Sequence, residues 1–294
     1  MTKIRVPASA SNLGPGFDCL GLALGLYNTF EFEPAEETVL EGAEPRFNNN
    51  DNLFLQGYRA AGGTGCLHVT FETDIPVSRG LGSSASLLTG GVLAAWLLNG
   101  TVDRNAVFQL VSDMEGHPDN AAAAVFGGLT ASMKGPGEDA HWITRSLKVS
   151  DLLRFTVMVP DYEIQTGEAR AILPADIPLA AAAANTGRAV LTCQGLASGD
   201  VGLLRAAERD LLHEPFRSGL IPHYDIIRTI AEEDTGGVTV ISGSGSTCLL
   251  ISDRPLGEQA RFNLMILPEH WNIRELPVAD GPEILENGVW QAII

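Results

Sequence analysis

The amino-acid sequence predicts an α+β fold, because its strands and helices do not alternate in the regular order of a doubly wound sheet. Residues 27–33 and 67–72 roughly alternate apolar and polar side chains, as half-buried strands do. Residues 87–98 are mostly apolar, which predicts a buried helix. The length of 294 residues suits two domains, for which we predict residues 1–150 and 151–294.

The first unit contains four further predicted elements. Residues 4–7 predict a strand that runs into a loop. Residues 103–115 and 119–126 predict two helices, with Asp103 and Asp119 as their N-caps. The polar segment that begins at Lys134 predicts a surface loop or a hairpin.

The second unit also mixes strands and helices. Residues 155–160 predict a strand, and helical patterns follow near 180–197, 200–213 and 223–233. Residues 237–252 predict two strands around the turn SGSGS. This order supports the α+β class for both halves of the chain.

The composition limits the kinds of partner. A formal net charge of −17 argues against nucleic acid and anionic membranes, which both reward excess Lys and Arg. The four cysteines lie far apart, so they indicate neither a disulfide framework nor a zinc site. The first residues lack the apolar core of a signal peptide, and residues 87–98 are too short to span a bilayer. We therefore expect a soluble, cytoplasmic protein.

The most specific local feature is the segment PVSRGLGSSAS at residues 76–86. Gly80 and Gly82 allow the backbone to approach a ligand, and Ser83 and Ser84 then open the apolar helix. Free N–H groups and the positive end of the helix dipole would converge there and bind an anion. An isolated GxG is more often a turn before a serine cap. The lysine of a Walker A loop is absent, which excludes an ordinary P-loop.

The longer pattern resembles the phosphate loop of the GHMP kinases, a superfamily that includes galactokinases, homoserine kinases, mevalonate kinases and phosphomevalonate kinases. VPASASNLGPGFDCLGLAL at 6–24, EGHPDNAAAAVFGG at 115–128 and SGSGST at 242–247 resemble, in the same order, segments of the homoserine kinases. The resemblance implies a ribosomal S5 domain 2-like first domain and a ferredoxin-like second domain. It also implies ATP and Mg²⁺ as cofactors.

The activity implied by the resemblance is phosphorylation of the hydroxyl of L-homoserine to O-phospho-L-homoserine, a step of threonine biosynthesis. ATP would then contact residues of the loop and one asparagine before it: Asn52, Pro76, Arg79, Gly80, Leu81, Gly82, Ser83, Ser84, Ala85 and Ser86. Glu115, with Ser83 or Ser84, would hold Mg²⁺, which prefers hard oxygen ligands.

The resemblance also implies a substrate site from both halves of the chain, made of Asn12, Asp18, His117, Asn120, Thr166, Arg170 and Arg217. Two arginines suit a carboxylate, because a guanidinium binds it in a bidentate manner, and Asp18 suits an ammonium group. His117 and Asn120 would position the reacting groups. Asp119 is either a catalytic base or only a helix cap.

Two alternatives stay open at this stage: another GHMP small-molecule kinase, or a catalytically inactive sensor with the same fold. Retention of Ser83, Ser84, Glu115 and Asp119 argues against the sensor, which need not keep a metal ligand. SGSGST is expected to lie beside the phosphate loop. Three departures from the family pattern, at Ser86, Ala122–Ala124 and Ser246, remove none of these groups. Members of the family are often homodimers.

Overall fold

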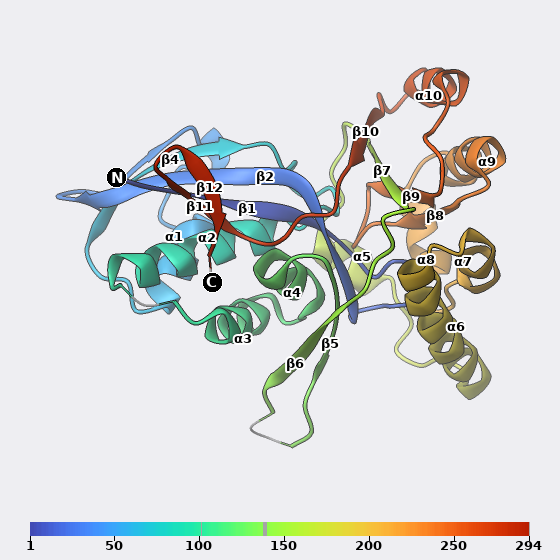
Figure 1. The fold of residues 1–294 in the computed structure, drawn as a ribbon, viewed down its shortest axis with the longest axis horizontal. Helices are drawn as coiled ribbons and strands as arrows, with labels where there is room; N and C mark the ends of the chain where they lie inside the picture. Colours follow the sequence, from blue (N-terminus) through green and yellow to red (C-terminus); the bar gives the residue numbers. More distant parts are fainter. Residues whose placement is uncertain (101, 138–139, 294) are drawn as a thin grey trace.

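The computed structural model describes residues 1–100, 102–137 and 140–293 and contains two antiparallel-rich sheets (Figure 1). In the first sheet the strand order is β12-β11-β1-β2-β4-β3, and β5 pairs with both β2 and β6. Its strands are β1 (Thr2–Ser11), β2 (Leu20–Ala35), β3 (Val39–Glu41), β4 (Cys66–Thr73), β5 (Leu129–Lys134), β6 (Trp142–Leu147), β11 (Glu283–Glu286) and β12 (Val289–Ala292).

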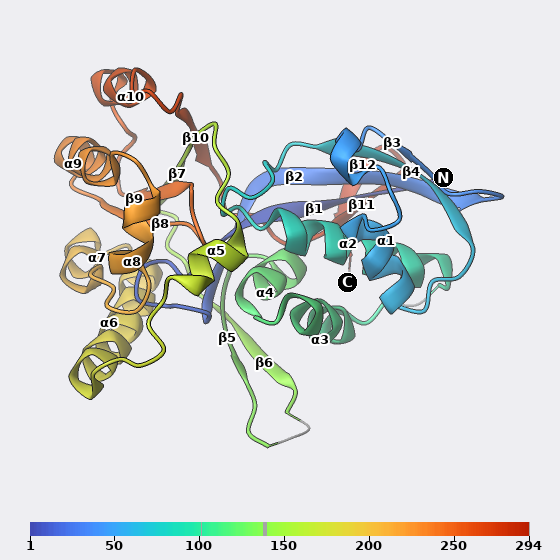
Figure 2. The same ribbon diagram turned by 180° about the vertical axis from the view of Figure 1, so that it is seen from behind.

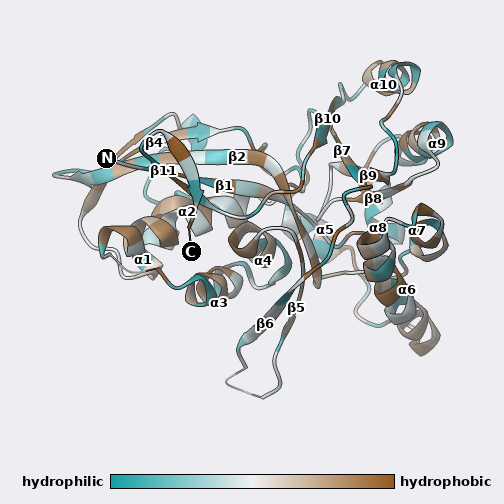
Figure 3. Ribbon diagram, in the orientation of Figure 1, coloured by the Kyte–Doolittle hydropathy of each residue, from teal (hydrophilic) through white to brown (hydrophobic). Residues whose placement is uncertain are grey.

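Helices cover one face of this sheet, as Figures 1 and 2 both show. They are α1 (Leu53–Ala60), α2 (Ser83–Leu98), α3 (Arg104–Glu115) and α4 (Asp119–Phe126), with the short 3₁₀ helix η1 (Pro45–Phe47) before α1. The core between helices and sheet holds Phe30 and Phe32 of β2, which alternate with less buried glutamates. Phe54 of α1 packs 5.0 Å from Phe30, ring centre to ring centre. Hydrophobic colours gather on α1 and α4 in Figure 3.

The second sheet has the order β10-β7-β9-β8. Its strands are β7 (Arg154–Val159), β8 (Val238–Ile241), β9 (Cys248–Ser252) and β10 (Asn272–Leu276). The helices of this half are α5 (Thr166–Ala171), α6 (Leu179–Ser198), α7 (Val201–Ala207), α8 (Glu214–Arg217), α9 (Tyr224–Thr235) and α10 (Glu258–Met265), with η2 (Ser218–Leu220) after α8. Among the described residues, no helix is long and apolar enough to cross a membrane.

The α+β class is confirmed, and most element predictions differ from the structure by a few residues. The apolar helix that contains residues 87–98 begins at Ser83, where the sequence analysis placed its opening serines, and the segment from Lys134 is part of the β5–β6 hairpin. The helix expected over 200–213 ends at Ala207. It stops early because the Asp210 carboxylate accepts hydrogen bonds from the N–H groups of residues 212–214, which starts a separate turn.

The end of the chain returns to the first sheet. Strand β11 pairs with β1, with Ile4 opposite Ile284, and β12 continues the sheet beyond it. The sequence analysis assigned all of residues 151–294 to the second domain and did not predict that the end of the chain pairs with β1. We therefore keep a division near residue 150 as a proposal and add the β11–β12 hairpin to the first unit.

Close packing of α1 against α2 generates a stability prediction. A Cβ atom built on Gly91 would lie 1.9 Å from the Phe54 carbonyl oxygen, so one helix must move to accommodate it. We expect Gly91→Ala to lower the free energy of unfolding by about 2 kcal/mol or more, as overpacked cores do. Thermal or urea unfolding measures this change.

Gly187 of α6 is the matched control, because nothing lies within 4 Å of a Cβ built there. We expect Gly187→Ala to raise the stability by ~0.5–1 kcal/mol, since alanine has the higher helix propensity. Equal effects of the two substitutions would contradict the close helix contact.

Candidate active site

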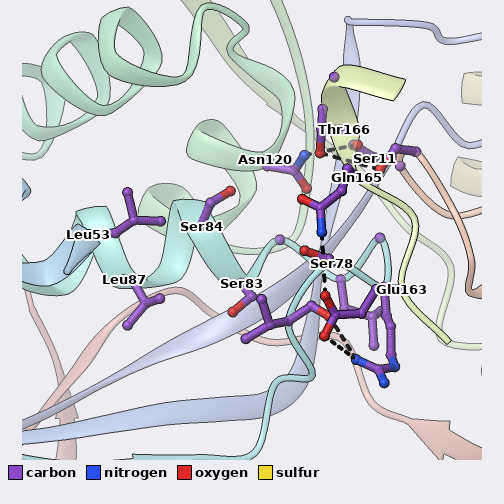
Figure 4. Close-up of a pocket in the computed structure, with 18 of the residues that line it drawn as sticks. Ser11, Leu53, Ser78, Ser83, Ser84, Leu87, Asn120, Glu163, Gln165 and Thr166 are labelled. Atoms are coloured by element: carbon purple, nitrogen blue, oxygen red, sulfur yellow. Dashed lines mark hydrogen bonds and ion pairs between the residues drawn. The ribbon is translucent and has the colours of Figure 1, made fainter. Parts of the chain in front are cut away.

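One cavity of about 600 Å³ receives residues from both halves of the chain. The 76–86 segment, the loop after β1, the start of α4, and helices α5 and α8 all contribute to its wall. Figure 4 shows Ser83 and Ser84 at the start of one helix and Asn120 beside Gln165 and Thr166. The motifs that the sequence analysis selected therefore meet in one place.

The 76–86 segment forms a turn whose geometry suits an anion, and we call it the anion-binding turn. Gly80 and Gly82 have φ values of +68° and +66°, a region that favours glycine. Gly82 is the N-cap of α2, and no side chain caps this helix end. The first N–H groups of α2 are thus left for a ligand in the cavity, where the helix dipole also favours negative charge.

The segment SGSGST lies beside this turn, as expected. Ser242 donates its hydroxyl to the Gly80 carbonyl oxygen at 2.6 Å, and Thr247 N–H donates to the Arg79 carbonyl oxygen at 3.2 Å. A Cβ on Gly80 would come within 2.1 Å of the Ser242 carbonyl oxygen. A Cβ on Gly82 would lie 2.0 Å from the Ser9 hydroxyl. Close backbone packing therefore requires glycine at position 80, and the Ser9 side chain leaves no room for a Cβ atom at position 82.

Four of the predicted ATP-binding residues either lie outside the cavity wall or have side chains bound to the backbone. Arg79 lines the cavity, but its guanidinium donates to the carbonyl oxygens of Val77, Pro160 and Asp161. Pro76, Ala85 and Ser86 are not among the lining residues. Ala85 and Ser86 are buried, and Ser86 donates its hydroxyl to the Val6 carbonyl oxygen. Direct contact of these four residues with a nucleotide stays a prediction.

Asn52 lines the cavity, but its side chain caps α1. Its Oδ1 accepts from Phe54 N–H at 2.9 Å, and its Nδ2 donates to the Phe47 carbonyl oxygen at 2.9 Å. Phe47, Leu53 and Leu87 contribute apolar side chains to the wall, and Figure 4 shows Leu53 and Leu87 near each other. Sequence reasoning missed these three, because isolated apolar residues look like ordinary core.

Glu115 and Ser84 form a pair suited to a metal. Ser84 donates its hydroxyl to Glu115 Oε1, while Oε2 is buried and has no partner among the described residues. Burial raises the pKa of the Glu115 carboxyl group, and a bound cation would favour its charged form. No cluster of three His, Cys, Asp or Glu side chains exists in the described ranges. Mg²⁺ fits this donor set, since it usually keeps waters and substrate phosphates as ligands.

His117 and Asp119 form a charged pair at the start of α4. His117 Nδ1 lies 2.8 Å from Asp119 Oδ1, which also accepts from Asn120 N–H at 2.8 Å. Burial lowers the pKa of His117, but the hydrogen bond and charge of Asp119 outweigh it and raise the pKa to about 9. Burial alone would raise the pKa of Asp119, yet its hydrogen bond with His117 lowers it. The pair is therefore imidazolium and carboxylate at neutral pH.

Asp119 is not the N-cap that the sequence suggested. The cap position is Pro118, and Asp119 is the first residue of the helix. Its carboxylate binds His117 and the next N–H group instead. Asn120 is held between two serines of β1, because Ser9 donates to its Oδ1 at 2.8 Å and its Nδ2 donates to Ser11 at 3.0 Å.

Asp18 and the two arginines meet at the far side of the cavity. Both Nη atoms of Arg170 donate to the Asp18 carboxylate, each at 2.9 Å. Arg217 is only 2% exposed and donates to the carbonyl oxygens of Ala169 and Gly243. The sequence predicted separate partners for Asp18 and Arg170, whereas here each neutralises the other.

The loop after β1 is fixed by Asn12. Its Nδ2 donates to the Gly243 carbonyl oxygen at 2.8 Å, and its Oδ1 accepts from Asp18 N–H at 3.0 Å. Thr166 lies close by, with its hydroxyl 3.5 Å from that of Ser244. All the predicted substrate-site residues line the one cavity.

Phe17 and His213 support the arginines, and sequence reasoning missed both. The Phe17 ring stacks on His213 at 5.2 Å, and the guanidinium carbons of Arg170 and Arg217 lie 5.7 and 5.2 Å from its centre. His213 is fully buried and its Nε2 lies 2.9 Å from the Gly14 carbonyl oxygen. Burial lowers the His213 pKa, so its neutral form donates there. The segment HEPFR at 213–217 places His213 four residues before Arg217, and this spacing could have indicated the contact.

Comparisons with known proteins agree with this arrangement. A family model described as the GHMP kinases N terminal domain matches residues 52–128. A homoserine kinase of Clostridium botulinum (strain Langeland) is 36% identical, and the match covers 98% of this chain and 99% of that protein. The solved structure of a Cytophaga hutchinsonii homoserine kinase has a TM-score of 0.78 at 24% identity over 96% of each chain.

A more distant structure is also similar. The Methanococcus jannaschii mevalonate kinase has a TM-score of 0.64 at 15% identity, over 94% of this chain and 98% of its own. These likenesses confirm the predicted GHMP kinase fold.

The charged pair at α4 can be tested by titration. We expect NMR to show that His117 titrates near pH 9. In Asp119→Asn the His117 pKa should fall, because the hydrogen-bonded negative charge is lost. His117→Gln identifies the resonance. A wild-type pKa near the ordinary ~6.5 would contradict the imidazolium assignment.

Proposed function

The chain belongs to the homoserine kinase family of the GHMP superfamily, and on this premise we propose that it transfers a phosphoryl group from ATP to the hydroxyl of L-homoserine. The product is O-phospho-L-homoserine, a step of threonine biosynthesis. One observation supports this proposal most: the anion-binding turn at Gly80–Ser84 and the arginines Arg170 and Arg217 line the same cavity. The proposal includes a cytoplasmic location and a homodimer.

The nucleotide end consists of the turn and an apolar wall. The free N–H groups at the start of α2 bind the phosphates, with no lysine needed in the loop. Phe47, Leu53 and Leu87 provide apolar surface for the base. Arg79 contributes by tying the turn to the backbone of Pro160 and Asp161, so that the turn keeps its shape when the nucleotide leaves.

The acceptor end matches a zwitterion. The Asp18–Arg170 pair presents one negative and one positive group, and Arg217 adds a second guanidinium. A bound amino acid can substitute for both interactions of the pair. Its ammonium group would then bind Asp18, and its carboxylate would bind the arginines. A neutral polyol cannot compensate both charges, so the site favours an amino acid over a sugar.

Catalysis by these residues is mainly positioning and charge. Phosphoryl transfer requires alignment of the attacking oxygen and neutralisation of developing charge. The His117 imidazolium and the Asn120 amide both face the cavity, and Asn120 is fixed by Ser9 and Ser11. Asp119 keeps His117 charged, and its lowered pKa makes it a weak base. We therefore propose that Asp119 acts through His117.

Mg²⁺ belongs to the same proposal. Ser84 and Glu115 would hold the ion, with Ser83 as the neighbouring hydroxyl on the cavity wall. When bound, Mg²⁺ neutralises charge on the phosphates. The orphaned Oε2 of Glu115 supports this assignment, because a buried carboxylate oxygen without a partner is costly in a protein that never binds a cation there.

An acceptor assay tests the proposed substrate. ADP release is measured with homoserine, threonine, mevalonate or galactose as the acceptor, for the wild type and for Arg170→Ala. We expect the wild type to prefer homoserine. Arg170→Ala should raise the KM for homoserine by about 10- to 100-fold, the usual weight of a charge-assisted bond, and leave the KM for ATP nearly unchanged.

Arg170 is chosen because it is 44% exposed, whereas Arg217 supports buried carbonyl groups and its loss would also unfold the site. Arg154→Ala, at a similarly exposed arginine on β7, is the control. Faster turnover with mevalonate or galactose than with homoserine would refute the substrate. A parallel rise of both KM values would refute the role of Arg170.

The metal proposal has its own test. We expect Glu115→Gln to lower kcat by at least about 100-fold and to raise the Mg²⁺ concentration needed for half-maximal rate, because the carboxylate charge on the ion is lost. Thermal stability serves as the control and should not fall, since burial opposes the charged form. Wild-type turnover at low Mg²⁺ would remove Glu115 from the metal site.

A further inference from the structure

An ion pair joins the two halves of the chain at the rim of the cavity. Arg46 of η1 donates from Nη1 and Nη2 to the two carboxylate oxygens of Glu163, at 3.1 and 2.6 Å. Glu163 belongs to the segment between β7 and α5. Both residues line the cavity, and Arg46 is 48% exposed, so the pair stands where the wall meets solvent. Figure 4 labels Glu163 among the lining residues.

The Glu163 end of the pair is anchored to the anion-binding turn. Ile164 N–H donates to the Ser78 carbonyl oxygen at 2.9 Å, and Arg79 reaches Glu163 Oε1 at 3.6 Å. Gln165 adds a longer contact, at 3.4 Å, to the other carboxylate oxygen. The hydrogen bond from Arg46 lowers the pKa of the Glu163 carboxyl group, which therefore stays charged at neutral pH.

The Arg46 end is also held from its own side. Its Nε donates to Glu44 at 2.9 Å, and its guanidinium carbon lies 4.6 Å from the centre of the Phe47 ring. Phe47 is part of the apolar wall, and Asn52 binds its carbonyl oxygen. The pair therefore connects the apolar wall to the turn directly, across the rim of the cavity.

We propose that Arg46 and Glu163 form a strap that retains bound nucleotide, so that release requires the pair to open. This inference rests on the proposed nucleotide site, which lies between the two anchors. A bidentate guanidinium–carboxylate pair has a defined geometry and two charge-assisted hydrogen bonds. Because the pair is exposed, its contribution is modest and falls as salt increases.

A different role for Arg46 makes an opposite prediction. If Arg46 bound the phosphates directly, Glu163 would only compete for it and repel the nucleotide. Removal of the Glu163 charge would then slow release. If the pair is a strap, removal of either charge opens it and speeds release. Glu163→Gln thus separates the two roles by the sign of its effect.

The experiment measures the dissociation rate of ADP with a fluorescent group on its ribose, by stopped flow with excess unlabelled ADP. The proteins are the wild type, Arg46→Gln, Glu163→Gln and the double variant. We expect each single variant to release ADP about two- to five-fold faster, the range for one exposed pair. The double variant should release no faster than the quicker single variant, because both changes remove one interaction.

Arg154→Gln is the matched control, since Arg154 and Glu275 form a pair of similar exposure between β7 and β10, outside the cavity wall. It should release ADP at the wild-type rate. Added salt should accelerate release more in the wild type than in the double variant, which no longer has the pair to screen.

The following outcomes contradict the proposed strap. Slower release from Glu163→Gln, additive effects in the double variant, or an equal effect of Arg154→Gln contradicts it while the nucleotide site stands. Failure of the wild type to bind labelled ADP overturns the nucleotide site and the strap together.

Discussion

The backbone contact between the Gly80 turn and the Ser242–Gly243 segment is the constraint on which the site depends. The two backbones approach so closely that a Cβ atom at Gly80 would have no room. This contact joins the two halves of the chain directly. The carbonyl oxygen of Gly243 also accepts from Asn12 and Arg217. One glycine-rich turn therefore sets the position of the α2 N-terminus relative to the substrate-side groups, and phosphoryl transfer depends on that alignment.

Local charge, rather than net charge, decides what this acidic protein binds. The chain carries −17 overall, yet four arginines and a charged histidine line its main cavity. Carboxylates bind Arg46, Arg170 and His117, while Arg79 and Arg217 bind carbonyl oxygens. Four carboxylates, of Asp18, Asp51, Asp119 and Glu163, line the same cavity as these five cationic groups, so the free site carries little net charge. An anionic nucleotide then finds donors in a site already preorganised for it.

Short sequence patterns predicted the features that depend mainly on residues close together in the chain. The α+β class, the glycine turn and the EGHPDN segment came from short patterns, and their residues meet in the structure. Contacts between distant segments could not be predicted in this way: β11 pairs with β1 at the other end of the chain, and Arg46 meets Glu163. For Asn52 the resemblance implied contact with ATP, and the structure adds that its side chain caps α1, which sequence patterns did not predict.

The two arginines of the proposed substrate site are not equivalent, and the difference has a physical reason. Arg217 is buried and its guanidinium donates to backbone carbonyl oxygens, so its position is fixed by the fold. Arg170 is partly exposed and bound to a carboxylate, which a ligand carboxylate can replace. Opening the Asp18–Arg170 pair costs binding energy for every ligand, but only a zwitterion restores both partners. The pair therefore lowers the affinity for every ligand, and it lowers the affinity for ligands of a single charge the most.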